Sequence, residues 1–185
     1  MQRTFTESAI HEPVIRPATH DDIPELLEMI RDLAEYHGER DRVTISEQQL
    51  AEELFASSSP LSARVVEAPA GSPHRLNGYS LWFAAFSPWE GSQVMHLEDL
   101  YVRPESRGTG SGKALLRNLA VIAHERDYRR IQWMVLKSNV SGARFYVSQG
   151  AGPMSEWDIF KLDESAIAAL EAGAVSTAPA PPAAA

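Results

Sequence analysis

Hydrophobic residues recur along this chain with two alternating periods, and the change from one period to the other predicts the elements. Spacing of three to four residues is typical of helices, and it predicts them at residues 23–36, 46–55, 110–126, 141–148 and 164–171. Short runs of β-branched, aliphatic and aromatic residues bounded by turn residues indicate strands, here at residues 13–16, 63–68, 79–86, 94–102, 131–136 and 157–162. Up to residue 162, the order β-α-α-β-β-β-α-β-α-β predicts an α/β fold with a mixed central β-sheet flanked by helices.

Polar residues at the expected helix boundaries agree with this assignment. Asp21 and Asp22 precede the first helix, and Gly38 follows it. Ser46 stands three residues before Gln49, the spacing of a capping box, at the start of the second helix.

The two ends of the chain lack the periodic pattern. The last residues are mainly Ala, Pro, Ser and Thr, with no large apolar side chain beyond Val175. Such a segment cannot bury enough apolar surface to offset its ordering entropy. We therefore expect a flexible N-terminus over residues 1–12, one domain over 13–171 and a disordered Ala/Pro tail over 172–185.

Composition narrows the functional classes. The 185 residues carry a formal net charge of −8, which disfavours nucleic acid as a partner and suits a cationic small molecule. No apolar run approaches a membrane span, and no signal peptide is evident at the N-terminus. The absence of cysteine excludes disulfides and thiolate chemistry and fits a cytoplasmic location.

A glycine-rich loop between a strand and a helix is the most informative segment. The strand ends at Arg103-Pro104, glycines follow at 108, 110 and 112, and an amphipathic helix begins at once. Free N–H groups at a helix N-terminus, next to the positive end of its dipole, form a site for phosphate or pyrophosphate. Arg107 adds a cation there. The segment indicates a nucleotide-containing cofactor.

Spacing decides which cofactor this loop fits. A P-loop needs Gly at position 107 and Ser or Thr at 114, where this chain has Arg and Ala. Alternate glycines do not match the dinucleotide fingerprint G-x-G-x-x-G either. The remaining pattern, Arg107-x-x-Gly110-x-Gly112, resembles the acetyl-CoA pyrophosphate loop of the GCN5-related N-acetyltransferase superfamily. A plain strand-to-helix turn is the alternative; the preceding strand and the Ala-Leu-Leu helix favour the cofactor loop.

Further motifs narrow the resemblance to the diamine (spermidine/spermine) N-acetyltransferase family over residues 14–163. They are Ile-Arg-Pro-Ala-Thr at 15–19, Gly-Tyr-Ser-Leu-Trp-Phe at 78–83, Ser-Pro-Trp-Glu-Gly at 87–91, Leu-Glu-Asp at 97–99, Asn139, Phe-Tyr at 145–146 and Glu-Trp at 156–157. The resemblance implies acetyl transfer from acetyl-CoA to a primary amine of a small cationic substrate. It also implies a homodimer.

The same resemblance implies the residues that contact acetyl-CoA. They are Leu100, Tyr101, Val102, Arg107, Gly108, Thr109, Gly110, Ser111, Gly112, Lys113, Asn139 and Tyr146. In this superfamily a bulge commonly splays the strand before the loop. A backbone N–H of Leu100 or Val102 would then reach the thioester carbonyl. Asn139 fits two roles equally, a helix N-cap or a pantetheine contact.

Two residues are candidates for proton transfer. Tyr146 matches the family's tyrosine that meets the CoA sulfur, so we expect it to be the general acid, the alternative being a tyrosine that only packs. Glu98 is the expected base or cation anchor, with Asp99 binding substrate or serving structure. Because neighbouring strand residues point to opposite faces, we expect these two carboxylates not to form a pair. For each, a strand-end ion pair is the alternative.

The remaining candidates concern substrate. Trp89 and Trp157 are candidates to wall the amine pocket through cation–π contact, the first interpretation of Trp89 being a core or rim aromatic. His37 and Ser87 stand where the family carries acidic residues of its polyamine groove. Their presence argues against a strong preference for a long polycation such as spermine, and His37 would oppose cations once protonated.

A metal site, another amine substrate and a non-catalytic role are the alternatives to this function. His96 and Glu98 share a strand face, but two ligands do not make a zinc site, so we expect no metal. Another amine, such as a thialysine-like amino acid or an aminoglycoside-like compound, is the nearest alternative substrate. A non-catalytic acyl-CoA-binding domain is the alternative from a different class.

Overall fold

The computed structural model describes residues 12–174, and these form two compact units that divide between Val140 and Ser141. The predicted flexible end over 1–12 and the tail over 172–185 lie almost entirely outside the described residues. That residues 13–171 act as one domain stays a prediction.

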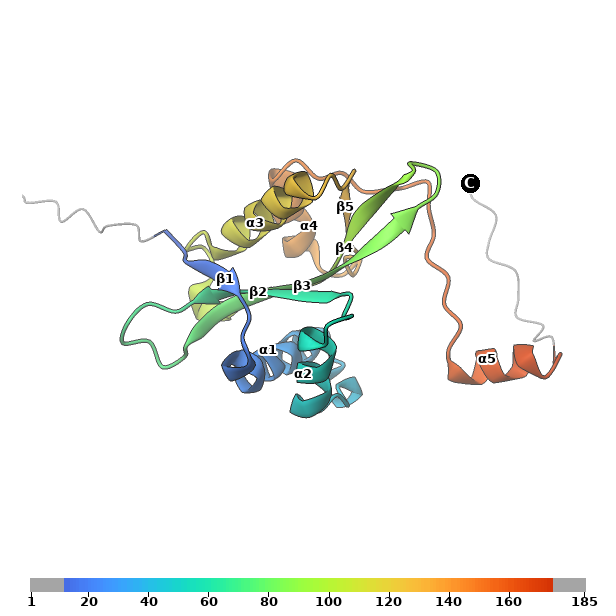
Figure 1. The fold of residues 1–185 in the computed structure, drawn as a ribbon, viewed down its shortest axis with the longest axis horizontal. Coiled ribbons are helices and arrows are strands. Elements are labelled where there is room, and N and C mark those ends of the chain that lie inside the picture. The colour runs from blue at the N-terminus through green and yellow to red at the C-terminus, as the bar shows by residue number, and fades with distance from the viewer. Residues whose placement is uncertain (1–11, 175–185) are drawn as a thin grey trace, which may run out of the picture. The chain divides into compact units, whose positions relative to one another are not determined.

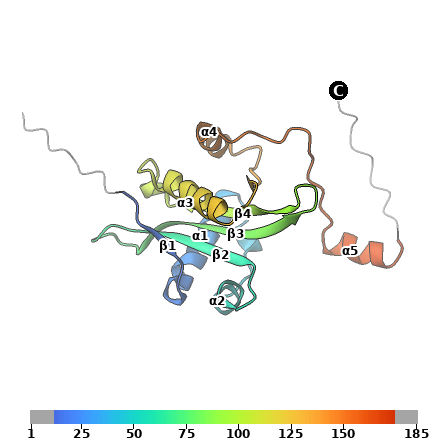
Figure 2. The ribbon, with the colours of Figure 1, turned by 45° about the horizontal axis from the view of Figure 1, so that its top comes forward.

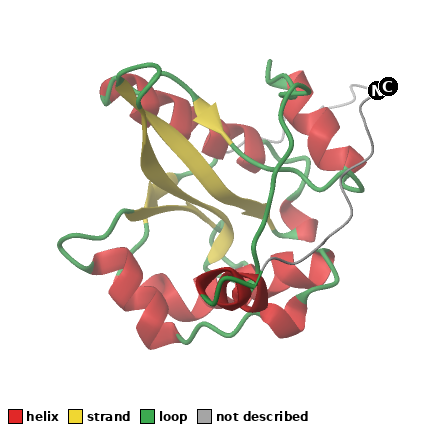
Figure 3. Ribbon diagram, turned by 90° about the vertical axis from the view of Figure 1, so that its right-hand side faces the viewer, coloured by secondary structure: helices red, strands yellow, loops and turns green. Residues whose placement is uncertain are grey.

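The first unit is built around one sheet with the order β1-β2-β3-β4-β5 among the described residues. Its strands are β1 (Ile15–Pro17), β2 (Leu61–Glu67), β3 (Leu76–Ser87), β4 (Ser92–Val102) and β5 (Ile131–Gln132). Neighbouring strands from β1 to β4 are antiparallel, and β5 runs parallel to β4. The mixed sheet predicted from the sequence is confirmed, and its strands twist strongly (Figure 3).

Helices cover both faces of this sheet (Figures 1 and 2). On one face lie α1 (Ile23–Tyr36) and α2 (Glu47–Phe55), preceded by the short 3₁₀ turns η1 (His20–Asp22) and η2 (Arg40–Arg42). On the other face lies α3 (Ser111–Glu125), which follows the 3₁₀ turn η3 (Pro104–Ser106). The second unit contains α5 (Glu164–Glu171) and most of α4 (Val140–Ser148).

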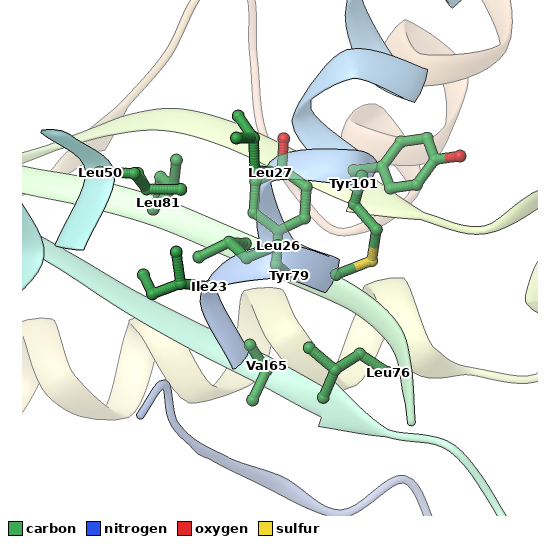
Figure 4. Packing of buried hydrophobic residues seen from close by; sticks show 10 residues of the cluster. Ile23, Leu26, Leu27, Leu50, Val65, Leu76, Tyr79, Leu81 and Tyr101 are labelled. Atoms are coloured by element: carbon green, nitrogen blue, oxygen red, sulfur yellow. The ribbon is translucent and has the colours of Figure 1, made fainter. Parts of the chain in front are cut away.

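Each face of the sheet has its own apolar core. Leu26, Leu27 and Met29 of α1 pack on Tyr79 and Tyr101 of the sheet, all at most 5% exposed (Figure 4). The opposite core joins α3 to β3, β4 and β5, and its buried members are Trp82, Met95, Leu97, Leu119, Ile122 and Ala123. Burying such side chains contributes about 1.5–3 kcal/mol each. These two cores hold β4 rigidly between α1 and α3.

A buried arginine at the end of β4 fixes α1 against this strand. Arg103 is 4% exposed, and its Nε donates to the carbonyl oxygen of Leu76 at 3.0 Å. Its guanidinium lies 3.3–3.4 Å from the carboxylates of Glu25, Glu28 and Asp32, all on α1. Since a buried cation needs such partners, this cluster sets the position of α1 over the end of β4.

The start of α1 is fixed by a second buried ion pair. The carboxylate of Asp22 is fully buried, accepts from Arg16 at 2.6 and 3.0 Å, and forms a capping box with Thr19. Burial opposes its ionisation, but hydrogen bonds from Arg16 and Thr19 outweigh this and lower the pKa of Asp22 to about 2. Its stabilising effect is complete above the ordinary pKa and is lost as pH falls toward 2. Asp22 stands at the N-cap position of α1 but makes no side-chain cap hydrogen bond to it; the capping box lies instead at the start of η1.

Two expected strands differ in the structure. The strand predicted over 131–136 is only the two residues of β5. Residues 157–162 form no strand, and the large side chains Trp157, Ile159, Phe160 and Leu162 are 57–83% exposed. A strand persists only where a neighbouring strand takes its backbone hydrogen bonds. The apolar pattern is typical of a strand, but the sheet of the described chain does not include residues 157–162, so this prediction was wrong.

Candidate active site

A β-bulge interrupts the pairing of β3 with β4 at the Leu-Glu-Asp motif. Leu81 pairs with Asp99, but the next residue of β3, Trp82, pairs with Leu97. Glu98 is therefore the extra residue on β4. The bulge that the family resemblance implied is present, and it reverses the alternation of the strand beyond it.

Two backbone hydrogen bonds show this reversal. The N–H of Met95 donates to the carbonyl of Arg130, just before β5, at 2.9 Å. The N–H of Arg103 donates to Asn77 of β3, also at 2.9 Å. In a regular strand, residues eight apart turn their N–H groups to the same side. Here they point to opposite sides because of the bulge.

The last residues of β4 therefore turn new N–H groups toward β5. Successive N–H groups of a strand point to alternate sides. Since the N–H of Arg103 points to β3, those of Val102 and Leu100 point toward β5. Strand β5 pairs with β4 only at Met95 and His96 within the described chain, so the two strands separate before Leu100 is reached. This arrangement supplies donors for an oxyanion at the separated edge.

The bulge also places Glu98 and Asp99 on the same face of the sheet, contrary to the sequence expectation. His96 stacks on Phe83 with ring centroids 4.8 Å apart, and its Nε2 lies 3.6 Å from Glu98. Asp99 accepts a hydrogen bond at 3.2 Å from Tyr79, which shares the α1 face with Phe83 by the alternation of β3. The expectation of opposite faces was wrong because it assumed an unbroken strand.

Asp99 lines a cavity of about 280 Å³ under the C-terminal end of α1. Burial raises its pKa to about 6, and the charge of Glu98 adds to this effect, whereas the Tyr79 hydroxyl opposes it. His37 lines the same cavity, as do Glu39 and Arg42 from the segment after α1. Arg42 was not expected to belong to the site, because loop residues follow no periodic pattern.

The glycine loop presents an open helix N-terminus. Gly110 is the N-cap of α3 with φ +94°, and Gly108 has φ +79°. Among the described atoms, none lies within 4 Å of a Cβ built on Gly110, and no side chain caps the helix. The Thr109 hydroxyl donates to the carbonyl of Ser106 at 2.7 Å and lies 2.9 Å from Ser111 Oγ. The first turn of α3 thus offers its backbone N–H groups to an anion.

Arg107 joins this loop to the separated end of β4. Its Nε donates to the Val102 carbonyl at 3.1 Å. Its guanidinium lies over the rings of Tyr36 and Tyr101, 5.6 and 5.9 Å from their centroids. The Tyr36 hydroxyl in turn donates to Asn139, directly before α4, at 3.3 Å. One chain of contacts therefore links the loop, β4 and the end of α1.

The other candidate residues are distributed more widely. Tyr101 is 5% exposed, so its side chain supports Arg107 from the core. Trp89 lies in the turn between β3 and β4 and is 87% exposed. Tyr146, half-buried on α4, and Trp157 belong to the second unit. The described residues contain no group of three or more His, Asp or Glu side chains placed to hold a metal ion.

Comparison with known proteins identifies the family. The acetyltransferase (GNAT) family model matches residues 77–151, which include the bulge and the glycine loop. Thialysine N-epsilon-acetyltransferase of Bos taurus is 33% identical over 165 residues, covering 85% of this chain and 96% of that one.

The chain belongs to the GNAT acetyltransferase family.

More distant relatives agree with this assignment. The L-ornithine N5-acetyltransferase of Arabidopsis thaliana is 27% identical over 85% of this chain and 87% of its own length. An integron cassette protein of Vibrio cholerae has the same fold, with a TM-score of 0.70, 24% identity, and coverage of 87% of this chain and 98% of that one. This N-acetyltransferase uses acetyl-CoA as its co-substrate, as its family does.

The residues of this acetyltransferase fit acetyl-CoA. The uncapped start of α3, with Lys113 in its first turn, suits the negatively charged pyrophosphate. The separated edge of β4 carries backbone groups that an extended amide-containing chain can pair with. Both features lie within the residues that the family model matches.

The raised pKa of Asp99 predicts an unusual pH dependence of stability. Its folded-state pKa of about 6 lies above the ordinary 3.8, so folding takes up a proton between these values. The free energy of unfolding should therefore fall as pH rises from about 4 to 6, by about 3 kcal/mol from this group. In Asp99→Asn, which keeps an acceptor for Tyr79, that fall should disappear.

Chemical denaturation at pH 4, 5, 6 and 7 measures this difference. Asp41→Asn, at an exposed position, is the matched control and should keep the wild-type profile. Parallel curves for wild type and Asp99→Asn would contradict the assigned protonation of Asp99.

Proposed function

We propose that this acetyltransferase transfers the acetyl group of acetyl-CoA directly to a primary amine of a small cationic substrate, within a ternary complex. The bulge at Glu98 is the observation that carries this proposal. It directs two carboxylates to one face and two N–H groups to the separated edge of the strand.

Each step of the transfer then has a group to perform it. Glu98 and Asp99 attract the ammonium, and Glu98 takes one proton, directly or through water, to leave a neutral amine. The amine nitrogen attacks the thioester carbon, and the N–H of Leu100 or Val102 stabilises the oxyanion. The carbon–sulfur bond then breaks, and Tyr146 protonates the departing thiolate, which leaves as CoA. The amide nitrogen gives up its second proton to water, and a proton from water restores the Tyr146 hydroxyl.

Glu98 is favoured as the base, rather than Asp99, because of its surroundings. Its side chain is 52% exposed, so water can carry the proton away. Asp99 is held by Tyr79 inside the cavity, which suits a fixed anchor for the ammonium. The loop from Arg107 to Lys113, with Asn139, is proposed to bind the remainder of acetyl-CoA.

The names of the relatives support a small amine as acceptor. They include thialysine N-epsilon-acetyltransferases, an L-ornithine N5-acetyltransferase and a spermidine/spermine N(1)-acetyltransferase-like protein. His37, which replaces a carboxylate of the family pattern, lines the cavity beside Asp99. Ser87, the other replacement, accepts from the Glu90 N–H at the end of β3 instead. We therefore expect spermine not to be strongly preferred over shorter amines.

A CoA-release assay tests the proposed function. Acetyl-CoA is incubated with the protein and with spermine, spermidine, putrescine, thialysine or lysine. Release of CoA and an acetylated amine are expected with at least one of the shorter amines. Binding of acetyl-CoA with no transfer to any amine would instead indicate the non-catalytic acyl-CoA-binding module. A clear kcat/KM preference for spermine would contradict the interpretation of His37.

A homodimer is also proposed. The family resemblance implies one, and a second copy would cover the exposed apolar side chains of Ile159, Phe160 and Leu162. Sedimentation at micromolar concentration should show a dimer, and a monomer there would reject it.

Among the described residues, no helix is long and apolar enough to cross a membrane. The cytoplasmic location stays a prediction.

A further inference from the structure

The cavity beside Asp99 carries both signs of charge. Asp99 enters it from β4, whereas Glu39 and Arg42 enter from the segment between α1 and α2. Apolar side chains of α1, together with Val43, form the rest of its wall, with His37 at the helix end. A pocket made only for a polycation has no need of an arginine.

Glu39 and Arg42 form a close ion pair within this wall. Arg42 Nη1 lies 2.7 Å from Glu39 Oε1, and the two side chains are 64% and 54% exposed. An ion pair this exposed contributes little stability, so it can open toward a ligand at low cost. The guanidinium has five N–H donors in a planar fork that matches a carboxylate. The neighbouring glutamate matches an ammonium.

These two charges side by side are complementary to the head group of an amino acid. Its carboxylate would meet Arg42, and its α-ammonium would meet Glu39. An alkyl side chain would then lie on the apolar part of the wall, with its terminal amine directed to Asp99. A diamine of equal length brings the ammonium for Glu39 but no carboxylate to neutralise Arg42, so the arginine repels it.

We propose that the Glu39–Arg42 pair binds the α-amino and carboxylate groups of an amino acid whose terminal amine is acetylated. This inference rests on the proposed acetyl transfer and adds the substrate class that this cavity selects. Arg42 is the residue that distinguishes such amino acids from diamines.

The comparison of lysine with cadaverine tests this directly, because the two differ only by the carboxylate. Wild type is expected to show a kcat/KM for lysine at least ten-fold above that for cadaverine. Arg42→Gln should lower the value for lysine about ten- to hundred-fold, mainly through KM, because charge-assisted hydrogen bonds are lost. The value for cadaverine should stay equal or rise. Arg42→Glu should reverse the preference.

A neighbouring arginine provides the control. Arg40 lies 3.8 Å from both Asp32 and Glu35 and does not line the cavity. Arg40→Gln removes the same charge from the same turn and should keep the wild-type ratio. Thermal melts of each variant show that the fold is retained.

The role of Glu39 is tested with 6-aminohexanoate, which has the carboxylate but no α-amino group. For the wild type, kcat/KM with 6-aminohexanoate should be several-fold below the value with lysine. For Glu39→Gln the two values should be equal. An equal loss in both would overturn the role of Glu39.

Two further outcomes separate this inference from the proposed function. If acetyl is transferred but the lysine-to-cadaverine ratio is the same in wild type, Arg42→Gln and Arg40→Gln, the carboxylate site is wrong and the function stands. If no amine is acetylated by the wild type, the proposed function fails first.

Discussion

Tyr146→Phe is expected to lower kcat by about a hundred- to ten-thousand-fold, while acetyl-CoA binds as in the wild type. The hydroxyl is proposed to donate its proton only as the thiolate departs, and general acid catalysis commonly has this magnitude. An interaction made only in the transition state affects kcat without affecting the binding of acetyl-CoA. Steady-state kinetics give kcat, and calorimetry gives the dissociation constant.

A second tyrosine tests whether any lost hydroxyl would have this effect. Tyr128 packs against Trp82 in the core beside α3, with ring centroids 6.4 Å apart, and has no proposed catalytic role. Tyr128→Phe should retain kcat. A wild-type rate in Tyr146→Phe would assign Tyr146 a packing role only.

Gly110→Ala is expected to weaken acetyl-CoA binding about a hundred-fold. The new methyl group would meet no described atom of the protein within 4 Å, so it projects where the pyrophosphate is proposed to approach the N–H groups of α3. Loss of one or two hydrogen bonds to a charged group accounts for about 3 kcal/mol, or a hundred-fold. Calorimetric titration with acetyl-CoA measures the change.

Backbone strain needs a separate control, because Gly110 has φ +94°. An alanine in this left-handed region costs about 1–2 kcal/mol wherever it stands. Gly150, after α4, has φ +90° and equally open surroundings among the described atoms. Gly150→Ala should therefore lose similar stability and keep acetyl-CoA affinity. Equal affinities in both variants would refute the pyrophosphate site.

Local patterns predicted much of the fold. The helices over 23–36 and 164–171 occur with those bounds, because amphipathic periodicity and capping residues are local properties. The glycine loop was identified for the same reason, since conformation and the exposure of N–H groups depend on a few consecutive residues. The family assignment, which rests on such short motifs, is confirmed.

Two features follow from no local pattern. The family resemblance implied a bulge in this strand, but Leu-Glu-Asp alternates as a regular strand would, and nothing in these three residues places the bulge at Glu98. The bulge exists because Leu97 packs in one core while Tyr101 packs in the other. These two residues are four apart, so a regular strand would direct their side chains to the same face. One extra residue in the strand places them on opposite faces. Arg42 was missed because loop residues enter a cavity through tertiary packing alone.

The sequence by itself determined most of the elements, the position of the glycine loop and the family, because each depends on residues close together in the chain. Only the tertiary structure decided that Glu98 and Asp99 share a face and that Arg42 lines the cavity of Asp99. These outcomes depend on the simultaneous packing of two cores against one strand. Such packing joins residues too far apart in the sequence for any local pattern to record.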